Sequence, residues 1–153
     1  MYKLLSVVVV IAIVIPTLTL AVTPFRSCPN GAPTPETFEV DGCTALPCTI
    51  TRGQPMRAVG RNLVSLVSTS TVEAYIDFFL GGLDLGIPTP PEIVDACANG
   101  IDFCPLVQDE SFDYTFFKED IQMDVSGITV LIRVGLRDGD VQIGCIEFDG
   151  TIV

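Results

Sequence analysis

Six cysteines constrain the fold of this chain more than any other feature of its sequence. An even number of cysteines in a short chain bound for an oxidising compartment indicates a framework of disulfide bonds. Six cysteines allow fifteen pairings, and two pairs are close enough to suggest local bridges: Cys43 with Cys48, and Cys97 with Cys104. No metal site is expected, because the chain has no histidine and no pair of CxxC motifs that could hold zinc.

The N-terminal residues have the layout of a signal peptide. A short basic start, Met1–Lys3, precedes an almost wholly apolar run over residues 4–15, which Pro16 ends. Small residues follow, so we expect a signal peptide over residues 1–21 and a mature domain over residues 22–153. A retained membrane anchor is the alternative, but the apolar stretch is interrupted and lacks basic residues just after it. These features predict a secreted, extracellular protein of one domain.

The charge of the chain excludes one class of partner. Without Lys3, seven basic residues remain against nineteen acidic ones, a formal net charge of −12. Nucleic acid is not expected as a partner, because its phosphates require basic patches. The same charge opposes nonspecific docking on anionic membranes and suits a soluble protein.

Three stretches of the chain predict long, half-buried strands. Apolar residues occupy every second position over residues 72–80, 112–116 and 128–136. A side-chain period of two is typical of a strand with one buried face. The inward-facing sets are Val72, Ala74, Ile76, Phe78 and Leu80; Phe112, Tyr114 and Phe116; and Ile128, Val130, Ile132, Val134 and Leu136.

Residues 56–67 predict a further strand with an irregular pattern. A bulge near Gly60 would allow Val59, Leu63 and Leu66 to share one face. The small side chains of this strand would also leave room inside the fold.

Turn signals separate these strands from shorter ones. Asp138–Gly139 predicts a hairpin between the strand that precedes it and a returning strand over residues 141–148, and Asp149–Gly150 predicts another turn. Residues 83–87 predict a short strand, and residues 118–126 a polar connection. The chain is therefore expected to be all-β, an antiparallel β-sandwich of seven to eight strands.

With cysteines and turns placed, the chain resembles the ML-domain family of secreted lipid-recognition proteins. Its nearest branches are the Niemann–Pick type C sterol carriers and the mite group-two allergens. The resemblance spans the mature chain and rests on these segments: Val40–Asp41–Gly42–Cys43, Pro47–Cys48, Arg52–Gly53–Gln54–Pro55, Leu85–Gly86–Ile87–Pro88, Cys97 with Cys104–Pro105–Leu106–Val107, Tyr114 and Cys145.

The family implies an immunoglobulin-like sandwich with three disulfides, whose two sheets part to hold a lipid. It implies the pairs Cys28–Cys145, Cys43–Cys48 and Cys97–Cys104. The two short pairs agree with the local spacing noted above.

The resemblance also implies lipid-binding residues. The pocket-lining positions of the sterol carriers correspond to Val107, Phe112 and Tyr114. Inward-facing apolar residues on the neighbouring predicted strands complete the candidate set: Ile76, Phe78, Ile87, Phe116 and Ile132.

Residues 87–91 are expected to form a rigid loop at the mouth of the pocket, because three prolines fix φ and withhold backbone donors. The sterol carriers have a phenylalanine where this chain has Pro91. A wider, less aromatic mouth would favour flexible acyl chains over a sterol.

The expected function is therefore binding and transfer of a sterol, fatty acid or related apolar ligand, with a membrane or a receptor as transfer partner. Recognition of microbial lipid for a receptor, as in innate immunity, is the alternative. A plain secreted sandwich acting through its surface is a third interpretation. We expect a monomer, no cofactor, and a location outside the cell or in the lysosomal lumen.

Catalysis is not expected. Without histidine there is no Ser-His or Cys-His nucleophile pair. Glu73, Asp77 and Asp113 fall on outward faces of predicted strands, where solvated charges are usual.

Overall fold

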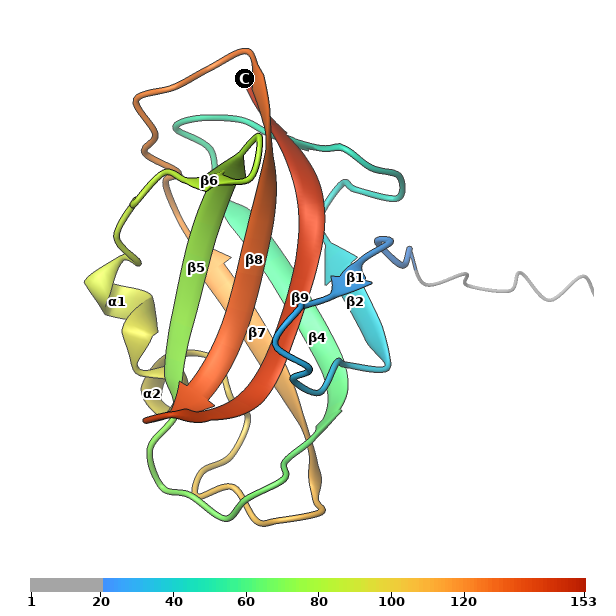
Figure 1. The fold of residues 1–153 in the computed structure, drawn as a ribbon, viewed down its shortest axis with the longest axis vertical. Helices are drawn as coiled ribbons and strands as arrows, with labels where there is room; N and C mark the ends of the chain where they lie inside the picture. The colour runs from blue at the N-terminus through green and yellow to red at the C-terminus, as the bar shows by residue number, and fades with distance from the viewer. Residues whose placement is uncertain (1–20) are drawn as a thin grey trace, which may run out of the picture.

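Alternating apolar residues arrange the chain into two β-sheets that pack face to face (Figure 1). The computed structural model describes residues 21–153, so the predicted signal peptide lies outside the described residues except for Ala21. The larger sheet has the order β1–β9–β8–β5–β6, with β3 also paired to β9. Its strands are β1 (Arg26–Ser27), β3 (Cys48–Ile50), β5 (Glu73–Leu80), β6 (Leu83–Asp84), β8 (Ile128–Asp138) and β9 (Val141–Ile152).

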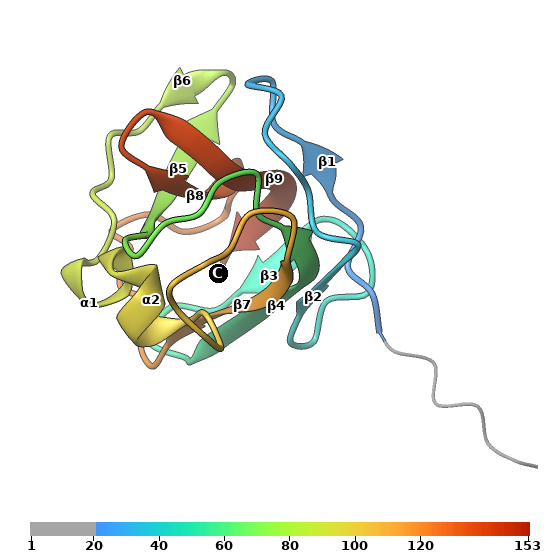
Figure 2. The same cartoon turned by 90° about the horizontal axis from the view of Figure 1, so that it is seen from below.

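The smaller sheet has the order β2–β4–β7 and forms the second layer (Figure 2). Its strands are β2 (Thr37–Val40), β4 (Met56–Val64) and β7 (Ser111–Lys118). All pairings in both sheets are antiparallel except the parallel pair β3–β9. Seven of the nine described strands are longer than two residues, which agrees with the predicted sandwich of seven to eight strands.

Two single-turn helices lie along one edge between the sheets, α1 (Pro91–Val94) and α2 (Ala96–Asn99) (Figure 1). Asp95 caps α2 by accepting a hydrogen bond from the Ala98 backbone nitrogen at 3.1 Å. No helix within residues 21–153 is long and apolar enough to cross a membrane.

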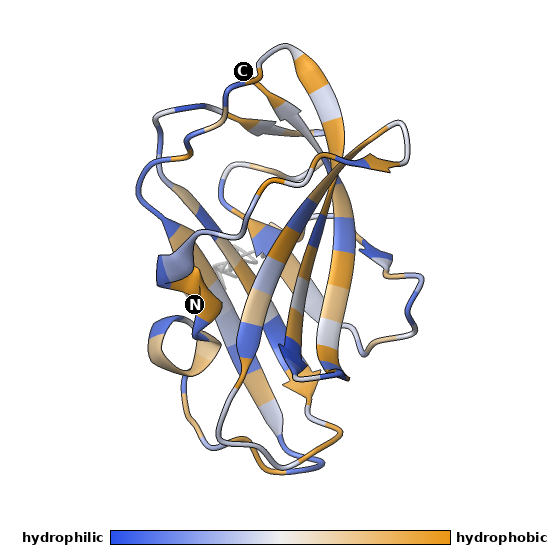
Figure 3. Cartoon of the chain, turned by 60° about the vertical axis from the view of Figure 1, so that its left-hand side comes forward, coloured by the Kyte–Doolittle hydropathy of each residue, from blue (hydrophilic) through white to orange (hydrophobic). Residues whose placement is uncertain are grey.

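The predicted alternation is visible along the strands as bands of opposite hydropathy (Figure 3). On β5, Ala74 and Ile76 are buried, while Glu73 on the outer face forms an ion pair with Arg137 of β8 at 2.7 Å. Apolar side chains from the inner faces of both sheets make one hydrophobic core.

The second predicted turn, at Asp149–Gly150, is wrong because β9 continues through it to Ile152. A side chain at position 150 would bring its Cβ within 2.8 Å of the Cδ1 atoms of both Ile50 and Ile132. Glycine here therefore permits close packing of two isoleucines rather than a turn. Asp149 forms an ion pair with Arg26 of β1 at 2.8 Å, which keeps the strand in register.

The disulfides join the pairs that the resemblance implies: Cys28–Cys145, Cys43–Cys48 and Cys97–Cys104. The first ties the segment after β1 to β9 across 117 residues of sequence. Closing a loop of that length lowers the entropy of the unfolded chain by the equivalent of roughly 4–5 kcal/mol. The other two bonds stiffen local loops, before β3 and after α2.

A bulge interrupts β4 near Gly60, as predicted. Gly60 pairs with Tyr114 and Leu63 with Phe112, so two residues of β4 oppose Asp113 alone. Asn62, in the bulge, has a φ of 54°, in the left-handed region that asparagine tolerates better than most residues.

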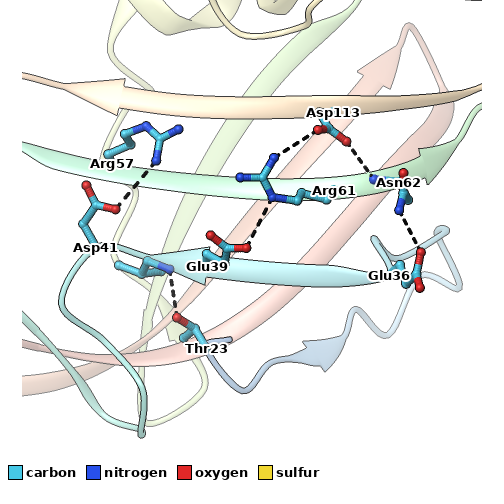
Figure 4. Close-up of polar contacts among 9 residues, drawn as sticks. Thr23, Glu36, Glu39, Asp41, Arg57, Arg61, Asn62 and Asp113 are labelled. Atoms are coloured by element: carbon cyan, nitrogen blue, oxygen red, sulfur yellow. Dashed lines mark hydrogen bonds and ion pairs between the residues drawn. The ribbon is translucent and has the colours of Figure 1, made fainter. Parts of the chain in front are cut away.

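Polar side chains hold this bulge in place (Figure 4). The Asp113 carboxylate accepts hydrogen bonds from the Asn62 backbone nitrogen at 2.9 Å and from the Arg61 guanidinium at 3.2 Å. The Asn62 amide donates to Glu36 at 2.8 Å.

The bulge turns Leu63 onto the inner face together with Ala58 and Gly60, which differs from the predicted grouping. Val59 alternates with those residues and faces the other side of the sheet. Leu66 lies beyond the strand and is 53% exposed.

We predict that Asp113→Ala destabilises the fold by about 1 kcal/mol, because the Asn62 nitrogen and the Arg61 guanidinium lose a charged acceptor at a partly exposed position. Urea unfolding measures the change. Asp102→Ala is the matched control, since no hydrogen bond or ion pair of Asp102 is found within residues 21–153. Equal losses in the two variants would contradict the role given to Asp113.

Candidate functional site

An apolar cavity of about 350 Å³ lies between the two sheets. Ligand pockets in proteins commonly measure roughly 300–1,000 Å³, so the cavity is large enough for a small ligand. One wall comes from the smaller sheet and is formed by Met56, Ala58, Gly60 and Leu63 of β4 with Tyr114 and Phe116 of β7.

The cross-strand register explains why this wall is hollow. Ala58 pairs with Phe116 and Gly60 with Tyr114, so each large ring of β7 stands beside a very small residue of β4. The expectation that small side chains in this strand leave room inside therefore agrees with the position of the cavity.

The opposite wall is built from rows of apolar side chains across β5, β8 and β9. Phe78 pairs with Ile132, which pairs with Phe148. A second row runs from Ile76 through Val134 to Ile146 in the same way. All six side chains line the cavity.

Exposure distinguishes the closed end of the cavity from its mouth. The most exposed wall residues are Pro88, Glu92 and Gln122. They belong to two segments of the wall, residues 87–92, which lead into α1, and residues 118–123, which begin at the end of β7. Residues farther along the cavity, such as Gly60, Leu63 and Gly144, are buried. The mouth therefore opens at the edge of the sandwich where α1 lies, the edge seen in Figure 3.

Polar groups at the mouth come from different elements. Lys118, the last residue of β7, forms an ion pair with Glu92 of α1. The hydrogen bond from Lys118 lowers the pKa of the Glu92 carboxyl. Gln122 also lines the mouth and donates a hydrogen bond to Asp120.

Tyr114 is the buried residue with a polar side-chain group among the described residues of the cavity wall. It is buried, and within residues 21–153 no hydrogen bond to its hydroxyl is found. Burial raises the pKa of this hydroxyl well above its usual range, so it is neutral and can donate a hydrogen bond at physiological pH. Gly100 packs against the ring so closely that a Cβ there would lie 2.4 Å from Cε2 of Tyr114.

Six of the eight predicted lipid-binding residues lie together in the cavity wall: Ile76, Phe78, Ile87, Tyr114, Phe116 and Ile132. The structure places the other two elsewhere. Val107 is 45% exposed and precedes the start of β7, whereas the mouth lies where that strand ends. Phe112 is 3% exposed and packs in the core. It precedes Tyr114, the first residue of β7 that lines the cavity.

The predicted proline loop lies at the mouth, although Pro91 itself does not. Ile87, Pro88 and Pro90 line the cavity. Pro91 is exposed as the first residue of α1 and is outside the wall, because the chain turns into the helix at that point.

Two further wall residues lie in the segment predicted as a polar connection. Ile121 and Met123 pack against the core and line the mouth. They alternate with Asp120, Gln122 and Asp124, a period-two pattern that could have revealed them. Lys118 and Glu92 were also missed, because their pairing joins segments far apart in sequence.

The carboxylates assigned to outward faces lie on the outer surfaces of the sheets. Glu73 pairs with Arg137, and Asp113 pairs with Arg61. Burial, together with the charge of Asp84, raises the pKa of Asp77. Among the described residues lining the cavity, Glu92 is the single carboxylate, so the wall has no pair of carboxylates for acid–base catalysis.

Comparisons with known proteins agree with this architecture. Residues 22–152 match the ML domain. The structure of a Niemann–Pick type C2 protein from Japanese carpenter ant is similar with a TM-score of 0.70 and 20% identity, covering 85% of this chain and 99% of that one.

Chicken MD-1, solved in complex with lipid IVa, is similar with a TM-score of 0.57 and 15% identity, covering 82% of this chain and 85% of that one. A search of curated proteins found no match. The likeness to the two solved structures concerns the fold, while the domain match covers almost all of residues 21–153. The chain therefore belongs to the ML domain family.

Proposed function

We propose that this protein is a secreted, non-enzymatic lipid-binding and lipid-transfer protein that holds one apolar ligand between its sheets. The observation that carries this proposal is the cavity of about 350 Å³, whose wall is almost entirely apolar and which opens at one edge. Water in such a cavity has few polar partners, whereas an apolar ligand gains roughly 25 cal/mol for each Å² of its surface that is buried.

The placement of polar groups supports an elongated ligand. The neutral side chain of Tyr114 is a buried part of the cavity wall, and the Lys118–Glu92 pair lies at the mouth. A few polar groups in an otherwise apolar pocket orient a ligand rather than supply most of its affinity. A sterol or a fatty acid has this amphiphilic chemistry, with one polar end and an apolar body.

Recognition of a microbial lipid on behalf of a receptor is the second candidate function. It is favoured by the similarity to chicken MD-1, which was solved with lipid IVa. We favour the carrier because the ant Niemann–Pick type C2 structure has the higher TM-score of the two. A carrier working as a monomer outside the cell or in the lysosomal lumen would exchange its ligand with a membrane or a receptor.

We predict that the protein secreted from cells carries a lipid at one molecule per chain. Native mass spectrometry of the purified protein gives the mass of the complex, and extraction identifies the ligand. A protein that carries no lipid, and that after delipidation binds neither oleate nor cholesterol, would contradict the proposed function.

We predict that Ala58→Phe abolishes lipid binding, because a large side chain at this wall position fills the cavity. We expect this substitution to destabilise the fold less than the same substitution at a closely packed core position, because the ring enters the cavity. Binding of oleate and of cholesterol by titration, with circular dichroism as a check of folding, measures the effect.

Val64→Phe is the matched control for this variant. Val64 lies on the same strand but is exposed and outside the cavity wall. Normal lipid binding by a folded Ala58→Phe protein would show that the ligand occupies another site.

A further inference from the structure

One basic residue differs from the others in its position. Among the described residues that line the cavity, Lys118 is the only cation. Five of the six arginines form ion pairs on the outer surfaces of the sheets: Arg26, Arg57, Arg61, Arg133 and Arg137. The sixth, Arg52, is exposed and outside the wall. The interior of this acidic protein thus has one place where a negative charge would be attracted.

Strand β7 fixes the direction of Lys118. Tyr114, Phe116 and Lys118 alternate with outward residues and face the cavity together. At about 3.3 Å per step, the four steps along the strand from Tyr114 to Lys118 span roughly 13 Å. A single chain of apolar groups could therefore run from Tyr114, past Phe116, to the cation at the mouth.

The present partner of Lys118 is replaceable. Glu92 belongs to the one-turn helix α1, and its side chain is 50% exposed, whereas that of Lys118 is 25% exposed. An ion pair with one partner this exposed is weak, because water solvates the carboxylate when the pair separates. Another carboxylate arriving from inside the cavity could take the place of Glu92 without leaving Lys118 unpaired.

We propose that Lys118 is the head-group site of the cavity and binds the carboxylate of a fatty acid, displacing Glu92, while the acyl chain lies along β7 towards Tyr114. This inference rests on the proposed function and names its ligand class. A neutral sterol hydroxyl cannot replace the charge of Glu92, whereas a carboxylate can. The cavity is near the small end of ligand pockets and holds one cation, which favours a single-chain monoanion over a phospholipid.

The environment of the mouth strengthens such a pair. Apolar side chains from both segments of the mouth line the cavity there: Ile121 and Met123 from the segment after β7, and Ile87 and Pro90 from the segment before α1. Attraction between charges grows as water is excluded from around them. A carboxylate bound there would thus interact with Lys118 more strongly than it would with an exposed arginine on the outer surface.

The test compares two ligands that differ only in the head group, oleate and oleyl alcohol, with cholesterol as a third. Affinities are measured by titration of the delipidated wild-type protein and of Lys118→Met, Lys118→Arg and Glu92→Gln. Arg57→Met is the matched control, because it removes one positive charge from the outer face of the neighbouring strand. Thermal unfolding checks that each variant is folded.

We expect the wild type to bind oleate at least tenfold more tightly than oleyl alcohol. Lys118→Met should remove that preference and leave the affinity for oleyl alcohol within threefold, while Lys118→Arg and Arg57→Met should keep the preference. Glu92→Gln should raise oleate affinity several-fold, because the competing carboxylate is gone.

Equal wild-type affinities for oleate and oleyl alcohol would overturn the proposal. An equal loss of affinity for both ligands in a folded Lys118→Met protein would also overturn it. The wild-type comparison and Glu92→Gln decide the question even if Lys118→Met fails to fold. If oleyl alcohol or cholesterol binds but oleate is not preferred, only the head-group site is wrong. If none of the three ligands binds, the proposed function is wrong as well.

Discussion

The apolar cavity keeps the two sheets from packing directly on each other along part of their inner faces, so bonds elsewhere contribute more to holding the sandwich together. The three disulfides, which close loops of 117, 5 and 7 residues, stabilise the fold by roughly 5, 2 and 2 kcal/mol on a chain-entropy estimate. The bond between Cys28 and Cys145 even lies in a separate small cluster outside the main core. The cysteines thus allow the interior to stay open.

The fold could be predicted from sequence because it depends on local signals. The alternation of apolar residues with a period of two predicted β5, β7 and β8, and the Asp138–Gly139 dipeptide predicted the β8–β9 hairpin. Asp149–Gly150 gives the same sequence signal but forms no turn, because Gly150 makes room inside β9 for Ile50 and Ile132 from other strands. Local sequence cannot distinguish a glycine that forms a turn from a glycine within a strand that leaves room for side chains of other strands.

The candidate site was less predictable, because the extent of the cavity depends on where side chains from the two sheets meet and where they do not. Phe112 and Tyr114 have the same spacing and chemistry in the sequence, yet Tyr114 lies in the wall and Phe112 lies beyond its end. The bulge at Asn62 makes this difference, since it brings Leu63 onto the inner face opposite Phe112 and closes the cavity there. That bulge depends on Asp113 and Glu36, which are distant in sequence.

The distribution of charge follows from the same architecture. The outer faces of both sheets use arginines to join neighbouring strands, as Arg133 does with Glu147 and Arg61 does with Glu39 and Asp113. Such pairs hold strand register, and the charges of their arginines are already balanced by carboxylates. A ligand bound at the proposed site and present at a hundredfold excess over its dissociation constant would add about 2.7 kcal/mol to stability. That contribution would come from the interior, because the arginines of the outer ion pairs do not line the cavity.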